Sequence, residues 1–188
     1  MKTLLFTVLL LSSLLPLQAA PALDMGAPTA NTPYCPHFGP VQAVLKRTGS
    51  AAPEFTEVER LLKVARGFRY DMDEPYRPQA PAATEQRRAG DCKDKSLWLL
   101  EKMGCQKVRF VVGKVERRAR INHAWLMWQQ EGRWWILDPT VASRPIAADS
   151  VSSDAYVPLY SYTRKGKRVH AAVSEFKTAA RVAAAASR

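Results

Sequence analysis

Apolar side chains recur at helical spacing in the segment from Thr56 to Phe68. The stripe consists of Val58, Leu61, Leu62 and Ala65. Thr56 and Glu59 have the spacing of a capping box at its start, and Gly67 marks its end. We therefore expect an amphipathic helix here, with its apolar face turned toward a core.

A second helical pattern runs from about Cys92 to Met103. Asp91 is a suitable N-cap before it, and Gly104 is a suitable stop after it. The apolar face consists of Leu97, Leu100 and Met103, widened by Trp98 and Leu99. This pattern predicts a core helix that begins at a cysteine.

After this helix the pattern changes to short runs rich in β-branched and aromatic residues. They predict strands over Val108–Gly113, Ile121–Gln129 and Arg133–Leu137, with a weaker one over Val157–Tyr162. A tight turn is indicated at 130–132, and Pro139 ends the third strand because it has no N–H to donate. The order helix, strand, strand, strand predicts an α+β fold with helices packed on an antiparallel sheet.

Proline, glycine and charge divide the chain into four segments. We expect a signal peptide at 1–20, a Pro-rich lead-in at 21–53, the folded domain at 54–163 and a basic Ala-rich tail at 164–188. A short helix is indicated near Val41–Arg47 within the lead-in. Tyr70–Ala83 contains three prolines and a cluster of acids, which predicts a loop.

The first residues have the three parts of a secretory signal peptide. Lys2 supplies a positive charge, Leu4–Leu17 is almost wholly apolar, and small residues follow at Ala19, Ala20 and Ala22. The apolar run falls short of the roughly 20 residues that span a bilayer, although an uncleaved N-terminal anchor is the alternative. We expect an exported protein, periplasmic or secreted after cleavage.

Composition is that of a globular protein with a strong positive balance. The chain has 188 residues, of which 47% are hydrophobic, and a formal net charge of +11. That content excludes a long disordered chain and fits one domain. The positive charge favours electrostatic contact with an anionic envelope surface. The sequence carries no nucleic-acid motif, so no specific nucleic acid is expected as a partner.

Cys92 has the position of a reactive thiol. At the first turn of a helix, free backbone N–H groups and the macrodipole favour an anion, which here would be the thiolate. The alternative is a cysteine that merely packs under the helix start.

His123 and Asp138 are predicted to meet across a hairpin. A two-residue loop pairs Gln130 with Arg133, and counting back along the strands places Asp138 opposite Trp125. His123 then lies on the same sheet face as Asp138, as a diagonal neighbour. A shift of one residue would separate them, and a half-buried His beside a strand-ending Asp is the alternative interpretation.

Three motifs in chain order resemble the transglutaminase-like cysteine peptidase superfamily, of the bacterial transglutaminase-like cysteine proteinase type. The motifs are Gly90-Asp91-Cys92-Lys93-Asp94, Asn122-His123-Ala124-Trp125 and Trp135-Ile136-Leu137-Asp138-Pro139-Thr140. The resemblance covers about residues 55 to 140 and implies a papain-like α+β core. It also implies Cys92 as nucleophile, His123 as base and Asp138 as the residue that orients the imidazole, while Asp94 matches a frequent acidic position.

The sequence departs from the family pattern around these motifs. Lys93 and Lys95 make the helix start more basic, which should further favour a thiolate. The Trp-rich segment and calcium ligands of the adhesin-cleaving branch have no clear match. Asp71, Asp73 and Glu74 could hold a cation, but a solvated acidic loop is the preferred interpretation, and we expect no metal and no cofactor.

Two supporting features complete the predicted site. Gln86 is a candidate side-chain donor to an oxyanion, beside the backbone N–H of Cys92. Of the three cysteines, Cys92 is claimed by the helix start, so export favours a disulfide between Cys35 and Cys105.

The implied chemistry is acyl transfer from an amide through a Cys-His-Asp triad. Water as acceptor makes the enzyme a peptidase or amidase, and a primary amine makes it a transglutaminase. A noncatalytic member that binds a peptide or an envelope component is one rival, and a basic protein that binds an anionic polymer is another. We expect a peptide or protein substrate and a monomeric enzyme.

Overall fold

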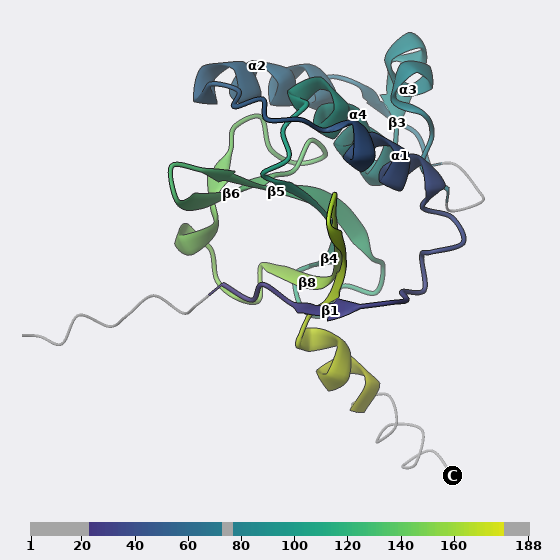
Figure 1. Ribbon diagram of the computed structural model, residues 1–188, viewed down its shortest axis with the longest axis vertical. Helices are drawn as coiled ribbons and strands as arrows, with labels where there is room; N and C mark the ends of the chain where they lie inside the picture. The colour runs from purple at the N-terminus through teal and green to yellow at the C-terminus, as the bar shows by residue number, and fades with distance from the viewer. Residues whose placement is uncertain (1–22, 73–76, 179–188) are drawn as a thin grey trace, which may run out of the picture.

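The fold is a curved antiparallel sheet with helices on one side (Figure 1). The computed structural model describes residues 23–72 and 77–178. The predicted signal peptide lies outside the described residues. Among those residues, no helix combines the length and the apolar character needed to cross a membrane.

Seven strands form the main sheet, in the order β1-β9-β8-β4-β5-β6-β7, and all neighbours are antiparallel. The strands are β1 Ala27–Thr29, β4 Val108–Val115, β5 His123–Gln130, β6 Arg133–Leu137, β7 Ile146–Ala147, β8 Tyr156–Thr163 and β9 Gly166–Val169. A separate parallel pair joins β2 Arg69–Tyr70 to β3 Ala89–Gly90.

Four helices lie over one face of the sheet (Figure 1). They are α1 Gly39–Arg47, α2 Phe55–Arg66, α3 Pro81–Arg87 and α4 Cys92–Met103. A 3-10 turn, η1 Ala148–Ser150, follows β7, and residues 172–178 are helical. The helix α4 contacts α1, α2 and α3 as well as β4 and β5, so it is the central helix of the layer.

The main core fills the space between α4 and the sheet. Leu97, Leu100 and Met103 of α4 are buried there against the alternate residues Leu126 and Trp128 of β5. The intervening residues of β5 face the other side of the sheet, where Trp125 and Met127 form a smaller apolar cluster. The predicted core face of the second helix is therefore confirmed.

The predicted hairpin register is also confirmed. Gln130 pairs with Arg133 and Leu126 with Leu137, as the two-residue loop requires. Glu131 and Gly132 both have positive φ in that loop, a conformation that Gly adopts without strain. The helix over 92–103 and the strand over 133–137 begin and end as predicted.

The predicted capping box on the first amphipathic helix is wrong. The helix begins at Phe55, and its N-cap, Glu54, makes no side-chain capping bond. Glu59 instead forms an ion pair with Lys63 one turn later, at 2.8 Å, so its carboxylate is not available to the helix start.

Three segments contain more regular structure than predicted. The lead-in holds the strand β1 in addition to the helix α1, which confirms the helix predicted near Val41–Arg47 and buries Val41, Val44 and Leu45. The loop over 70–83 ends earlier than predicted because α3 begins at Pro81, in the first turn where its missing N–H costs nothing. The basic tail contributes β9, which pairs with both β8 and β1 after a tight turn, so the domain boundary at Thr163 is wrong.

Candidate active site

Cys92 is the first residue of α4 and lies at the junction of that helix with β3. Its side chain is buried at 5% exposure. Gly90, two residues earlier, has no room for a side chain, because an added Cβ would lie 2.7 Å from the Cβ of Asp94. The Gly-Asp-Cys sequence therefore brings β3 close against the first turn of the helix.

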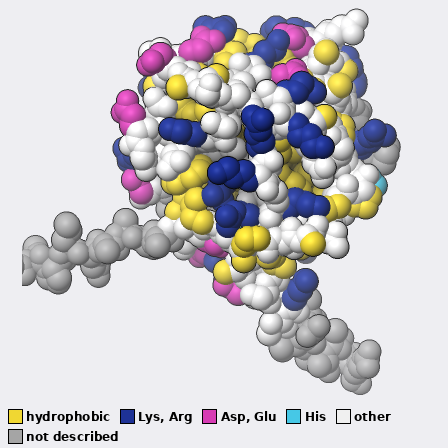
Figure 2. Space-filling view, viewed as in Figure 1, with side chains coloured by type: hydrophobic (Ala, Val, Ile, Leu, Met, Phe, Trp, Pro, Cys, Tyr) yellow, Lys and Arg dark blue, Asp and Glu magenta, His cyan; other side chains and the backbone are white. Residues whose placement is uncertain are grey.

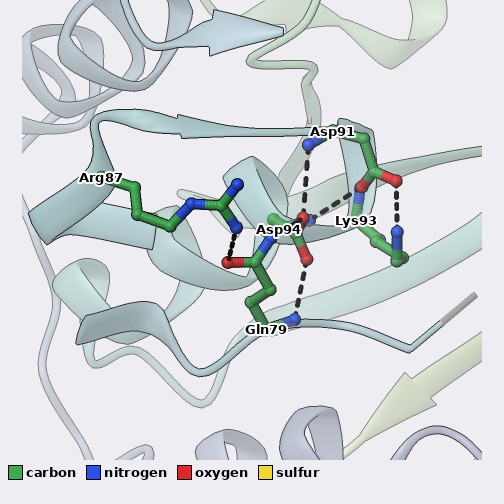
Figure 3. A network of polar contacts seen from close by, with 5 residues as sticks. All are labelled: Gln79, Arg87, Asp91, Lys93 and Asp94. Carbon is green, nitrogen blue, oxygen red and sulfur yellow. Dashed lines mark hydrogen bonds and ion pairs between the residues drawn. The ribbon is translucent and has the colours of Figure 1, made fainter. Parts of the chain in front are cut away.

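A capping box fixes the start of α4 (Figure 3). The Asp91 carboxylate accepts hydrogen bonds from the backbone N–H groups of Lys93, at 3.0 Å, and Asp94. The Asp94 carboxylate in turn accepts from the N–H of Asp91, at 3.3 Å. Asp91 is thus directed at the backbone donors of the helix start.

Asp94 also fastens the preceding segment to the helix (Figure 3). It accepts from the backbone N–H of Gln79 at 2.8 Å and from the side-chain amide at 3.2 Å, and Arg87 donates to the carbonyl of that amide. Burial raises the pKa of Asp94, and the nearby Asp91 acts in the same direction, although the bond from Gln79 opposes both. Asp94 therefore stabilises the structure around the site rather than taking part in the chemistry.

The two lysines at the helix start are buried rather than directed at the sulfur. Lys93 is fully buried and forms an ion pair with Asp91, which neutralises its charge. Lys95 is 1% exposed and donates to the backbone carbonyl of Phe68 at 2.5 Å, and burial lowers its pKa. The ion pair with Asp91 therefore offsets the stabilisation of the Cys92 thiolate that was expected from the charge of Lys93.

His123 and Asp138 meet as the hairpin register predicts. The imidazole Nε2 lies 2.8 Å from Oδ2 of Asp138, which is fully buried after β6. The same carboxylate accepts from the backbone N–H of Thr140 at 2.9 Å and from the hydroxyl of Tyr156 at 3.1 Å. These bonds fix the carboxylate, while the ring of Trp125 stacks against the imidazole at 6.3 Å.

His123 also lies close enough to Cys92 for the thiol to act on its pKa. Burial alone would lower the pKa of His123, but the bond and charge of Asp138, together with the effect of Cys92, outweigh it and raise the pKa to about 10. Because Nε2 bonds Asp138, Nδ1 is the ring nitrogen that remains for Cys92. The start of α4, the start of β5 and the end of β6 thus converge on one imidazole.

Tyr70 is a site residue that the sequence analysis missed. It lies on β2, opposite Gly90 of β3, close enough to Cys92 for that side chain to act on the pKa of its hydroxyl. Burial of the hydroxyl, together with the negative charges of Cys92 and Asp91, raises the pKa of Tyr70 to about 12. A strand of two residues has no periodicity, so only the tyrosine itself, inside a predicted loop, could have signalled the contact.

Gln86 is not brought to the site. It lies on the exposed side of α3, and within the described chain no hydrogen bond joins it to Cys92. The prediction of Gln86 as an oxyanion donor is therefore wrong. Its helix packs on α4 through buried Pro81 and Thr84, which turns Gln86 toward solvent.

The predicted disulfide is also wrong, because all three cysteines are free thiols. The sulfur of Cys35 accepts from the backbone N–H of Thr32 at 3.2 Å and from Lys167 at 3.4 Å. Burial would raise the pKa of Cys35, but these bonds lower it. Cys105 is buried after α4, where its sulfur accepts from the N–H of Lys107.

The acidic loop gives no metal centre in the part of the chain that the structure describes. Asp71 forms ion pairs with Arg69 and Arg87, and no three potential ligands cluster among the described residues. Asp73 and Glu74 lie outside them.

Comparisons with known proteins bear on the fold. No protein-family model and no curated protein matches the chain. Calcium-bound LapG from Legionella pneumophila superimposes with a TM-score of 0.51 at 18% identity, covering 69% of this chain and 76% of that chain. The EGTA-treated form of LapG gives 0.50 at 18% identity, covering 69% and 74%. The predicted α+β fold, with helices packed on an antiparallel sheet and a cysteine at a helix start, is confirmed, and LapG shares this fold.

Proposed function

We propose that the chain is a thiol-dependent acyl-transfer enzyme acting on amide or peptide bonds, as a cysteine peptidase or amidase. In this proposal Cys92 is the nucleophile, His123 the base and Asp138 the residue that orients the imidazole. The observation that carries it is the position of His123, which bonds Asp138 at 2.8 Å and lies close enough to the Cys92 thiol to be influenced by it. A nucleophile, its base and an orienting group in contact are the parts that thiol activation requires.

The chemistry follows from these contacts. The Cys92 thiolate attacks the carbonyl carbon, so a C–S bond forms and the carbonyl oxygen gains negative charge. His123 gives its proton to the amine nitrogen as the C–N bond breaks, leaving an acyl-enzyme. The neutral imidazole then takes a proton from water, whose oxygen attacks the thioester and releases the acid. Asp138 holds Nε2 throughout, which keeps Nδ1 turned to the reacting atoms.

Two donors are available for the developing oxyanion. The Asp91 side chain occupies the N–H groups of Lys93 and Asp94, whereas the N–H of Cys92 has no hydrogen-bond partner within the described residues. Tyr70 places a protonated hydroxyl beside the same sulfur. We assign these two groups to the oxyanion hole, in which preorganised donors stabilise the transition state.

The acceptor and the compartment belong to the same proposal. Water as acceptor gives hydrolysis, and a primary amine gives transamidation by the same steps.

The pattern of residues 1–20 supports export to the periplasm or the exterior. Fusing these residues to a reporter that is active only after export tests this part of the proposal.

The decisive experiment compares alkylation of Cys92 by iodoacetamide in the native protein and in His123→Ala. We expect fast alkylation at neutral pH in the native protein and slow alkylation in the variant, because the imidazolium stabilises the thiolate. Peptide turnover, measured with water alone and with an added amine, should vanish in Cys92→Ala and persist in the control Cys35→Ala. Asp138→Asn should lose about 10⁴-fold in turnover and far less in alkylation.

The catalytic interpretation would be overturned by a specific result. If native Cys92 alkylates at the rate of a free cysteine, with the same pH dependence in His123→Ala, no ion pair exists. The chain would then be a noncatalytic protein that binds a peptide without cleaving it.

A further inference from the structure

A groove of about 550 Å³ lies at the end of the sheet where β5 and β8 end and β4, β6 and β9 begin. Its charged lining is entirely basic within the described chain, and Trp134 forms part of its wall. The basic side chains are Lys107, Arg109, Arg164, Lys165, Lys167 and Arg168. We call this feature the basic groove. Figure 2 shows the wider setting, a face with Lys and Arg in its middle and most Asp and Glu near its margins.

No carboxylate neutralises the basic groove. Across the described residues, none of the six cations forms an ion pair, although most other basic clusters of the chain do. Asp24 is the carboxylate that acts on Arg109, and it is engaged by the backbone N–H groups of Gly26, at 2.7 Å, and Ala171, at 2.9 Å. Unpaired charges of one sign in a concave surface concentrate a positive potential there.

The three guanidinium groups are held in place by backbone carbonyls. Arg109 donates to Met25 at 2.9 Å and lies 5.1 Å from the ring of Trp134, Arg168 donates to Gly26 at 2.6 Å, and Arg164 donates to Thr48 at 2.6 Å. Each of these bonds uses one of five N–H donors. The remaining donors are fixed at low entropic cost and match the oxygens of an oxoanion.

The density of charge favours phosphate over carboxylate. A phosphate monoester carries about −1.5 to −2 charges and three acceptor oxygens on one centre. An extended acidic peptide carries one charge per residue and presents carboxylates on one face only about every 7 Å. Two or three neighbouring phosphates can therefore balance six cations inside a groove of this size, whereas the few peptide residues that fit cannot.

We propose that the basic groove binds clustered phosphate groups, supplied either by a soluble oligophosphate or by phosphorylated lipid headgroups. The groove and His123 lie at opposite ends of β5, about 20 Å apart for an extended strand of this length. A ligand in the groove therefore does not cover the thiol site. The groove holds the protein on a phosphorylated molecule or surface without contact to Cys92, and this binding does not depend on the proposed catalysis.

The test is titration calorimetry with inorganic tripolyphosphate at about 50 and 200 mM salt, since screening weakens such binding. The variant is Lys107→Glu with Lys165→Glu, two exposed side chains of the groove. Its control is Arg66→Glu with Arg118→Glu, which makes the same change in net charge at exposed positions outside the groove. We expect the dissociation constant to rise about tenfold or more in the variant and less than about twofold in the control.

The source of the phosphate is decided by a second arm. Vesicles of phosphatidic acid in phosphatidylcholine are compared with tripolyphosphate at equal accessible phosphate, and the tighter probe identifies lipid or soluble ligand. The proposal fails if neither probe binds at the lower salt, if variant and control weaken equally, or if an oligoglutamate peptide binds more tightly than both. If the charge-reversal variant does not fold, Lys107→Gln with Lys165→Gln replaces it, and binding unchanged there also overturns the proposal.

Discussion

His123 and Tyr70 approach the Cys92 sulfur from different elements and with different chemistry. The pKa of His123 is raised to about 10, so its imidazole keeps a proton at neutral pH. The pKa of Tyr70 is raised to about 12, so its hydroxyl stays protonated. In the proposed mechanism His123 therefore supplies charge and a transferable proton, and Tyr70 supplies a neutral hydrogen-bond donor.

Replacing Tyr70 by Phe should lower kcat by about 100-fold with little change in KM, because a donor to the oxyanion acts mainly in the transition state. The rate of Cys92 alkylation should change far less, since no oxyanion forms in that reaction. Peptide turnover and iodoacetamide alkylation are measured on the same preparation.

Tyr160→Phe is the matched control. Its ring is half-buried, and no hydrogen bond of its hydroxyl is present among the described contacts. Turnover that is unchanged or faster in Tyr70→Phe would show that the hydroxyl covers the sulfur instead of stabilising the transition state.

At the scale of elements, the hairpin and the central helix were predictable because their signals are local. Glu131-Gly132 sets the β5–β6 register, and that register alone brings His123 to Asp138. Asp91 and Gly104 bracket α4 through capping interactions within four residues of its ends. The catalytic candidates could thus be placed together from the sequence.

The elements that were missed depend on distant partners. The strand β9, Gly166–Val169, contains charged residues that indicate a tail when only the sequence is considered. It forms a strand because β1 and β8 pair with it on its two sides. The strand β2 exists only because β3 lies beside it, and it delivers Tyr70. The prediction for Gln86 was wrong for a similar reason, because tertiary contacts decide which side of α3 packs on α4.

Gly113 shows how one position links strand packing to the site. It pairs with His123 across β4 and β5, and a Cβ there would lie 2.1 Å from the carbonyl oxygen of Val157 and 2.7 Å from the Trp125 ring. Gly113→Ala should therefore lower the free energy of unfolding by about 3 kcal/mol, as overpacking does. Urea denaturation measures it, with Gly49→Ala, which meets nothing within 4 Å, as control. Equal stability in both variants would contradict the expected clash.

His170 should make stability depend on acid. Its Nε2 lies 2.9 Å from the Ser161 hydroxyl between β8 and β9, and burial lowers its pKa, although Asp24 opposes this. A folded-state pKa below the unfolded value near 6.5 means that stability is complete at higher pH and falls as pH drops below about 6.5.

The measurement is the free energy of unfolding between pH 7 and pH 5. In His170→Gln the slope should be flatter by up to about 1.4 kcal/mol per pH unit, which corresponds to one proton. His37→Gln, at an exposed position, is the control and should keep the native slope. Parallel curves for the native protein and His170→Gln would rule out this residue as the acid-sensitive group.

In the molecule as a whole, the two regions for which a function is proposed lie at opposite ends of the strands. The thiol site lies where β5 begins and β6 ends, and the basic groove lies at the other end of both strands. The sheet that joins them is completed at one side by segments from both ends of the chain, because β1 pairs with β9. The basic residues of 164–168 are therefore part of the folded domain.

Truncation tests this last point. Removing everything after Thr163 deletes β9, leaves β1 without its neighbour and exposes the edge of β8. It also removes four of the six cations of the groove, Arg164, Lys165, Lys167 and Arg168, and it removes His170 from its bond with Ser161. We expect the truncated chain to be insoluble or to melt well below the native protein, since β8 is then an exposed edge strand without a partner and favours aggregation.

A chain ending at Thr178 is the control. It keeps every described element and should retain the native melting temperature. If the chain ending at Thr163 melts with it and keeps its turnover, β9 is dispensable and the sheet is complete without the basic segment.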